Sequence, residues 1–240
     1  MPLRPSGKKI WEKHVKDYTE IFRRALIALS SLPKIDASEV AISTQLNTLL
    51  QKECFKYNRE LPYPKYNLPI PPKAKGKNSV QEKTGQPDFT CCFKDGYAEA
   101  YDKSEFNFHI ECKCLGLPNR SNWVFNKNYV NEGIMRFDHK DKCYGENAAD
   151  GMMVGYIISM NTENICKEVN AELAKIKRNF SPICFVPSSE LLKETTQQLK
   201  RVVIAPSDFT LTHLWIVLTH CLPVQMAVEN DKQIGQHVTR

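Results

Sequence analysis

The chain has 240 residues, 42% hydrophobic and 25% charged, a composition that is ordinary for a soluble globular protein with a sizeable core. Its formal charge of +6 favours an anionic partner only mildly. Nine cysteines, an odd number with no secretory signal before them, exclude a disulfide scaffold, and no run approaches the roughly 18 apolar residues of a membrane span. We therefore expect a reduced, cytoplasmic protein with no membrane partner and a single domain over residues 1–240.

Two helices are expected at the start of the chain. Over residues 10–32 apolar side chains recur every three or four positions, which predicts an amphipathic helix packed through its aromatic side. With the residues before it, this helix forms an N-terminal helical extension over residues 1–33. Acidic and hydroxyl residues at 36–39 suit a second helix start, and that helix is expected to run to about Phe55, with Glu39 in its first turn.

A proline-rich stretch and a basic loop follow. Residues 61–72 contain five prolines, which excludes a regular helix or a central strand. The next residues are expected to form an exposed, flexible loop that carries Lys73, Lys75 and Lys77. Two interpretations stay open: these lysines lie along the phosphates of DNA, or the loop is simply a solvated connection.

Two strands are expected in the stretch that follows. Residues 88–93 are rich in β-forming side chains, and residues 106–114 alternate strictly between apolar and polar positions. In the second strand the apolar side chains face the core, whereas His109, Glu111 and Lys113 share the other face. Glu111 and Lys113 would then lie about 7 Å apart along the strand.

The rest of the chain alternates helices with strands. Helices are expected at residues 126–138 and 162–178, and strands at residues 152–159, 202–205 and 209–218. The tail over residues 224–240 is expected to be flexible. This order of elements favours an α/β fold in which helices cover both faces of a central mixed sheet.

The polar face of the second strand suggests metal chemistry. If the two strands pair, Asp88 and Glu111 converge at one edge of the sheet, where solvent reaches them. Two carboxylates in such a place suit Mg²⁺ or Mn²⁺ better than zinc, and such an ion activates water beside a phosphodiester. Lys113 would position or deprotonate that water, or stabilise developing charge. The alternative is a surface salt bridge on an edge strand.

These residues carry a resemblance. Pro87-Asp88 followed by Glu111-Cys112-Lys113 resembles the PD-(D/E)xK nuclease superfamily, the fold of many restriction endonucleases. The resemblance implies a restriction-endonuclease-like core in which Asp88, Glu111 and the main-chain carbonyl of Cys112 hold Mg²⁺, with Mn²⁺ as a substitute. It further implies that Lys113 acts on the attacking water.

The resemblance extends to other segments of the chain. The superfamily often places a glutamate on a helix upstream of the motif, and Glu39 is our candidate, with Glu53 as second choice. Residues 129–137 and 151–156 look like segments downstream of the motif in compact bacterial nucleases, several of them from antiviral defence loci. The resemblance therefore covers residues from about 38 to 160.

Further side chains were weighed for this site. Arg136 is expected to contact a DNA phosphate, since a guanidinium matches phosphate oxygens, although an ordinary surface arginine is the alternative. Tyr129 is a weaker DNA-binding candidate that packing would also explain, and His109 would contact substrate or simply belong to an edge strand. The cysteines of the two strands lack the spacing of a zinc site and are expected in the core: Cys91, Cys92, Cys112 and Cys114.

We therefore expect a divalent-metal-dependent endonuclease that hydrolyses DNA, as the nuclease effector of a bacterial antiviral defence system. The sequence has no P-loop, so any nucleotide-driven step would come from a partner ATPase or helicase. Cleavage of two strands needs two sites, which favours a homodimer or larger complex. The alternatives are a stand-alone, type II-like restriction endonuclease and a non-catalytic nucleic-acid-binding or protein adaptor with a nuclease-like fold.

Overall fold

The computed structural model describes residues 7–59, 61–70, 73–75, 79–81, 85–94, 105–118, 124–185 and 190–222. Its helices are α1 (Gly7–Ser30), α2 (Glu39–Tyr57), α3 (Phe125–Asn131) and α4 (Thr162–Leu173), and its short 3₁₀ helices are η2 (Ile134–Asp138) and η3 (Thr219–Cys221). Its strands are β1 (Lys65–Tyr66), β2 (Lys73–Lys75), β3 (Ser79–Gln81), β4 (Phe89–Lys94), β5 (Glu105–Leu115), β6 (Asp150–Ile157), β7 (Asn179–Phe180), β8 (Leu192–Lys200) and β9 (Asp208–Val217).

Seven of these strands form one mixed sheet in the order β1-β4-β5-β6-β9-β8-β7. The middle strands β5, β6 and β9 run parallel to one another, whereas β4 and β8 pair antiparallel with their inner neighbours. Parallel strands are normally buried on both faces, and β6 and β9 are almost continuously buried along their lengths. The expected α/β class with a central mixed sheet is confirmed.

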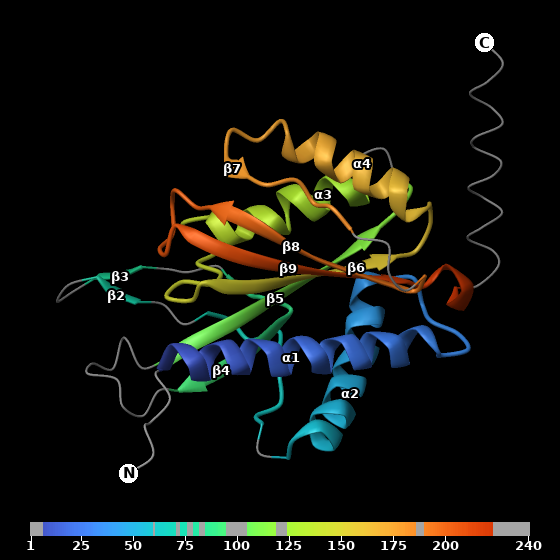
Figure 1. Ribbon diagram of the computed structural model, residues 1–240, viewed down its shortest axis with the longest axis horizontal. Coiled ribbons are helices and arrows are strands. Elements are labelled where there is room, and N and C mark those ends of the chain that lie inside the picture. The colour runs from blue at the N-terminus through green and yellow to red at the C-terminus, as the bar shows by residue number, and fades with distance from the viewer. Residues whose placement is uncertain are drawn as a thin grey trace.

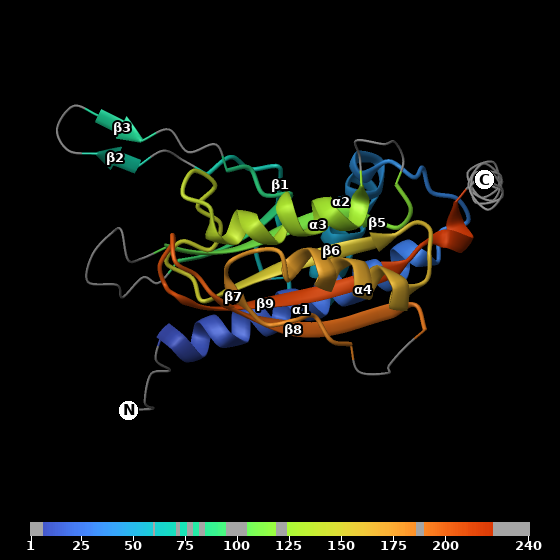
Figure 2. The same cartoon turned by 90° about the horizontal axis from the view of Figure 1, so that it is seen from above.

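Helices cover both faces of the sheet, as expected. α1 and α2 lie on one face and α3 and α4 on the other (Figure 1), and the view from above looks onto α3 and α4 with α1 behind the sheet (Figure 2). The first pair encloses one core with Phe89 and Phe108, and the second pair encloses another with Leu115 and Trp215. The sheet is therefore the middle layer of three.

α1 packs through its aromatic side, as its periodicity predicted. Tyr18, Phe22, Leu26 and Leu29 are all 0% exposed, and the ring of Phe22 meets that of Phe89 edge to face at 5.5 Å. The segment expected as an N-terminal helical extension thus contributes to the same core as the sheet. Residues 224–240, expected to form a flexible tail, lie outside the described residues.

The helix expected over residues 126–138 is interrupted, and this prediction was wrong. α3 ends at Asn131, and η2 follows as a separate 3₁₀ segment. Gly133 lies at the break, where an added Cβ would stand 2.3 Å from the carbonyl oxygen of Tyr129 and 2.5 Å from the Met153 side chain. The chain therefore passes too close to its neighbours for any larger residue, and it leaves the helical path there.

Other element predictions were also wrong in part. α4 ends at Leu173, five residues before the expected end, and residues 202–205 are not a strand but part of the connection between β8 and β9. β8 was not predicted, because its sequence LKETTQQLK has few of the β-branched and aromatic residues typical of strands. Within the basic loop, β2 and β3 form an antiparallel hairpin, so its expected lack of structure does not hold for residues 73–75 and 79–81.

Two exclusions made from the sequence concern the chain as a whole. In the described ranges no helix combines the length and apolar character needed to cross a bilayer. All nine cysteines are free thiols, and those expected in the core are buried at Cys91, Cys112 and Cys114. Cys92 is only half-buried.

Candidate active site

The candidate site lies where β5 extends beyond its neighbour β4. β4 pairs with β5 only as far as Phe89 opposite Ile110, so the next residues of β5 have no strand partner on that side among the described residues. The N–H of Cys112 donates instead to Oδ2 of Asp88 at 2.7 Å, and the N–H of Cys114 donates to Oε2 of Glu39 at 3.2 Å. Because buried backbone donors need acceptors, the overhang draws two carboxylates to one short segment of β5.

This geometry corrects one expectation and keeps another. The strands of the motif do pair, and their register places Asp88 level with Glu111. β5, however, is an interior strand, so the carboxylates do not meet at an edge of the whole sheet. Glu111 is only 1% exposed, which excludes a surface salt bridge on an edge strand.

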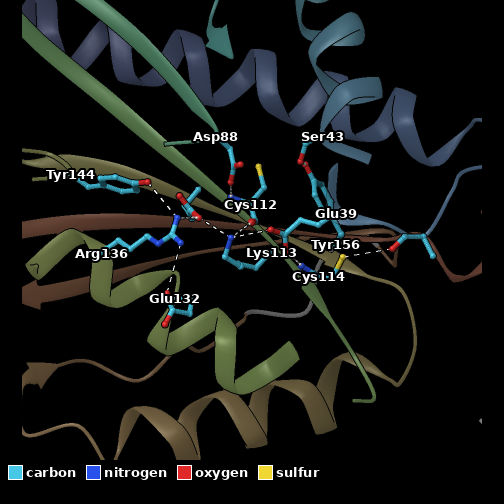
Figure 3. Close-up of polar contacts among 12 residues, drawn as sticks. Glu39, Ser43, Asp88, Cys112, Lys113, Cys114, Glu132, Arg136, Tyr144 and Tyr156 are labelled. Atoms are coloured by element: carbon cyan, nitrogen blue, oxygen red, sulfur yellow. Dashed lines mark hydrogen bonds and ion pairs between the residues drawn. The ribbon is translucent and has the colours of Figure 1, made fainter. Parts of the chain in front are cut away.

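Glu111 is the most deeply buried acid of the site. Its Oε1 accepts hydrogen bonds from Nζ of Lys113 at 2.7 Å and from Nη1 of Arg136 at 2.6 Å (Figure 3). Its Oε2 is buried and has no hydrogen-bond partner among the described residues. One oxygen of this carboxylate therefore carries two cations while the other is left without a donor.

The ammonium of Lys113 lies at the centre of the site, within hydrogen-bond distance of three oxygen atoms. Its Nζ donates to Oε1 of Glu111, to Oε1 of Glu39 at 3.0 Å and to the main-chain carbonyl of Cys112 at 2.9 Å. Burial lowers the pKa of Lys113, but the charges of Glu111, Glu39 and Asp88 together raise it above its ordinary value. The ammonium therefore stays protonated across the physiological pH range.

Asp88 has the most informative titration. It precedes β4 directly and is half-buried. Burial and the nearby charge of Glu111 raise the pKa of its carboxyl from 3.8 to about 7, although Lys113 and the N–H of Cys112 oppose that shift. Asp88 thus exchanges its proton near neutral pH.

Glu39 reaches the site from the N-terminus of α2. Ser38 caps that helix by accepting a hydrogen bond from the N–H of Ala41 at 3.2 Å, so Glu39 lies in the first turn, where a carboxylate is favoured. The second-choice Glu53 instead pairs with Lys56 at 2.7 Å, about 21 Å further along the same helix. Of the two candidates, the structure brings only Glu39 to the motif.

A buried hydrogen bond that the sequence did not reveal fixes α2 against the sheet. The hydroxyl groups of Ser43 and Tyr156 lie 3.1 Å apart (Figure 3). Ser43 lies one helical turn after Glu39 and therefore on the same side of α2. The spacing of Glu39 and Ser43 was a usable signal, but nothing in the sequence paired Ser43 with Tyr156.

Arg136 enters from the opposite side of the sheet, on η2. Besides Glu111, its Nη1 lies 3.4 Å from the hydroxyl of Tyr144, and its Nη2 lies 3.8 Å from Oε2 of Glu132. Its side chain is 24% exposed. Burial lowers the pKa of Arg136, but the charge of Glu111 raises it above its ordinary value, so the guanidinium stays charged.

The loop that contains Tyr144 and Gly145 covers the polar face of β5. The N–H of Gly145 donates to Nδ1 of His109 at 2.9 Å, and His109 is only 4% exposed. The buried guanidinium of Arg201 holds this loop by donating to the carbonyls of Tyr144 and Gly145 at 3.1 to 3.2 Å. His109 is therefore a buried support beside the site, not an edge-strand side chain.

The other DNA-binding candidates fare differently. Tyr129 is 0% exposed, and its hydroxyl bonds to Nδ1 of His213 at 2.7 Å and to Nε1 of Trp215 at 2.8 Å. The expectation that Tyr129 contacts DNA is wrong, because its ring is buried in the core and its hydroxyl is hydrogen-bonded to two other core side chains. The side chains of Lys73 and Lys75 and the whole of Lys77 lie outside the described residues.

Comparisons were made with family models, with curated proteins and with solved structures. None of them found a match. The candidate site therefore has to be judged on its own chemistry.

The donor atoms suit a hard divalent cation. Glu39, Asp88 and Glu111, here called the acidic cluster, together with the carbonyl of Cys112, offer only oxygen, which Mg²⁺ and Mn²⁺ prefer. The buried, unpartnered Oε2 of Glu111 is an acceptor that such an ion would satisfy. In the arrangement seen, Lys113 occupies the centre, and among the described residues no three His, Cys, Asp or Glu side chains are placed to share a metal. The residue types fit the ion, while the present geometry is organised around an ammonium.

Proposed function

We propose that this protein is a divalent-metal-dependent nuclease of the PD-(D/E)xK type that hydrolyses DNA phosphodiester bonds. One observation supports this above all: Glu39, Asp88, Glu111 and Lys113 converge from three separate elements on the overhang of β5. Burying these charges costs desolvation energy, so the cluster is a poor device for stability alone. Buried charges with displaced pKa values gather at functional sites.

The arrangement of elements supports a restriction-endonuclease-like core. A helix with an acid in its first turn precedes two antiparallel strands that carry the motif, and a parallel strand follows on the other side of β5. On the overhang of β5, the N–H and the carbonyl of Cys112 both point to the side where β4 has ended. A residue of an antiparallel pair uses these two groups to bond to its neighbouring strand. That carbonyl is therefore presented beside the acidic cluster.

In this proposal Asp88, Glu111 and the carbonyl of Cys112 hold Mg²⁺ or Mn²⁺, with Glu39 as a further acid. When bound, the ion lowers the pKa of a water molecule and neutralises charge on the phosphate. Asp88 and Glu39 each have one oxygen held by a backbone N–H of β5, which fixes the direction of the carboxylate.

Lys113 acts as a donor and not as a base. In the metal-free protein its raised pKa keeps it protonated, so in that state it has no lone pair with which to remove a proton from water. A protonated lysine orients water by donating to its oxygen and stabilises negative charge that develops on the phosphate. Of the roles expected from the sequence, positioning of the water and stabilisation of developing charge are the ones that a protonated lysine fills.

The biological setting is part of the proposal. We assign the protein to the bacterial cytoplasm as the nuclease effector of an antiviral defence system, with DNA as substrate and a partner ATPase or helicase as the source of any nucleotide-driven step. A homodimer or larger complex would supply the second site that a double-strand break needs. A stand-alone restriction endonuclease with the same site is the alternative within this class.

One observation favours a second candidate, a non-catalytic adaptor. Lys113 already donates to Glu39, to one oxygen of Glu111 and to the carbonyl of Cys112, so each of these groups has a cationic partner without any metal. An adaptor with this fold would keep such a neutralised core. It would bind nucleic acid or protein without cleaving it.

Plasmid nicking with Mg²⁺ tests the proposal. We expect Asp88→Asn and Lys113→Met to lose about 100-fold or more of the wild-type rate, the loss typical of removing one electrostatic group from a catalytic site. Glu163→Gln is the matched control, since it removes a carboxylate that is 79% exposed on α4. Equal cleavage by all four proteins would refute the assignment. If the wild type itself does not cleave, calorimetry decides: no heat of Mn²⁺ binding with or without DNA identifies an adaptor.

A further inference from the structure

We propose that Arg136 couples metal binding to phosphate binding: without DNA it is a counter-ion of Glu111 that opposes the metal, and with DNA it moves to a phosphate. The inference rests on the proposed nuclease function. It adds that the metal centre is weak until nucleic acid is present.

The charges on Glu111 carry the argument. Both cations of the site bond to the same oxygen, Oε1, at 2.6 and 2.7 Å, and Oε2 has no partner among the described residues. A structural ion pair would spread its donors over both oxygens of a buried carboxylate, since an unsatisfied one is costly. Two positive charges at this distance also repel a divalent cation that approaches Glu111.

Arg136 is the less firmly held of these two cations. Lys113 is neighbour to Cys112 on β5 and is held by three oxygen atoms, whereas Arg136 stands on the separate segment η2. Among the described residues its Nε is buried without a hydrogen-bond partner, and its Nη2 has only the distant Glu132, whose side chain is 61% exposed. The guanidinium thus uses few of its five donors, and its side chain is 24% exposed.

A phosphate can bind the guanidinium of Arg136 through two hydrogen bonds, whereas Glu111 binds it through one. Phosphate oxygens accept two parallel N–H bonds from one guanidinium, while Glu111 receives a single Nη1 contact. Once Arg136 turns to a phosphate, Lys113 is the one cation left on Glu111 among the described residues, and the charge of Glu111 becomes available. By linkage, DNA must then tighten metal binding by the same factor by which metal tightens DNA binding.

Titration of Mn²⁺ without nucleic acid is the first test. Arg136→Met removes the charge but keeps an apolar stem, and we expect it to bind Mn²⁺ at least about tenfold tighter than the wild type, equivalent to about 1.4 kcal/mol. Arg136→Lys, which keeps a cation, should bind no more than about threefold tighter. Lys167→Gln is the control for net charge, because it removes an exposed lysine on α4, and it should match the wild type.

The second test measures binding of a labelled DNA duplex by anisotropy, with and without Ca²⁺, a hard cation that prefers oxygen ligands, while a gel verifies that the duplex stays intact. We expect Ca²⁺ to tighten DNA binding by the wild type at least about tenfold. Arg136→Met should bind DNA more weakly and show less than about twofold response to Ca²⁺.

The outcomes separate the two proposals. If Mn²⁺ binds the wild type and Arg136→Met equally, or binds the variant more weakly, the coupling is refuted and the metal centre stands. If no variant binds Mn²⁺ with or without DNA, the nuclease function fails and the coupling fails with it.

Discussion

Replacing Asp88 with asparagine should make the metal-free protein more stable above neutral pH. The carboxyl of Asp88 has its pKa raised from 3.8 to about 7 in the folded protein, chiefly by burial and by the charge of Glu111. Between those two values the folded state holds a proton that the unfolded state has lost. Stability is therefore lost as pH rises through this window, and the full cost is present above pH 7.

The size of the effect follows from the shift. About three pKa units at about 1.4 kcal/mol each set an upper limit of about 4 kcal/mol. Asp88 is half-buried, so solvent screens part of this charge, and we expect a gain of about 1 to 2 kcal/mol at pH 8. Asparagine retains a side-chain oxygen that can accept the 2.7 Å hydrogen bond from the N–H of Cys112, so this backbone donor of β5 keeps its partner.

Urea unfolding in EDTA at pH 5, 6, 7 and 8 measures this difference, with the slope of the transition checked for two-state behaviour. The advantage of Asp88→Asn should grow with pH and level off above pH 7. Glu163→Gln, at an exposed carboxylate, should differ from the wild type by less than about 0.5 kcal/mol at every pH. A gain that does not change with pH, or a loss of stability at pH 8, would refute the assigned environment of Asp88.

Three further predictions concern neighbouring features. Mg²⁺ should raise the melting temperature, more at pH 8 than at pH 6 because bound metal must replace the proton of Asp88; a pH-independent shift measured by calorimetry would contradict this. Tyr129→Phe should cost about 1 to 3 kcal/mol in urea unfolding, because the buried partners Trp215 and His213 lose their hydroxyl, yet its DNA affinity should equal that of the wild type. Weaker DNA binding by folded Tyr129→Phe would restore it as a DNA contact. Tyr156→Phe should lower Mn²⁺ affinity through the displaced α2 while costing only about 1 kcal/mol of stability, and unchanged affinity would show that α2 is held by packing alone.

The sequence predicted much of the site because local patterns place its residues. Strict alternation placed Glu111 and Lys113 on one side of a strand, and the capping residues before Glu39 placed that acid in a first helical turn. The pairing of the two strands of the motif was a condition of the hypothesis, and the register of β4 and β5 meets it. The strand alternation and the helix start depend on residues that are close together in the chain, and such local patterns can be read from a sequence.

What escaped prediction depends on contacts between distant segments. The polar side of β5 reads as a solvated face, yet the loop held by Arg201 covers it and supplies the N–H that His109 accepts. For Tyr129 packing and DNA binding both stayed open, because its partners His213 and Trp215 are more than 80 positions away. At Gly133 an added Cβ would stand 2.5 Å from the Met153 side chain, a close approach between distant segments that no helical periodicity reveals.

The hydrogen bond between Ser43 and Tyr156 sets the angular tolerance of the site. A helix carries its side-chain tips about 5 to 6 Å from its axis, so a turn of α2 by only about 20° would move the Glu39 carboxylate by about 2 Å. That displacement exceeds what either of its hydrogen bonds, to Lys113 and to the N–H of Cys114, can absorb. The hydroxyl pair one turn away opposes such a rotation, so a methyl-sized change at its contact would be passed on to the carboxylate.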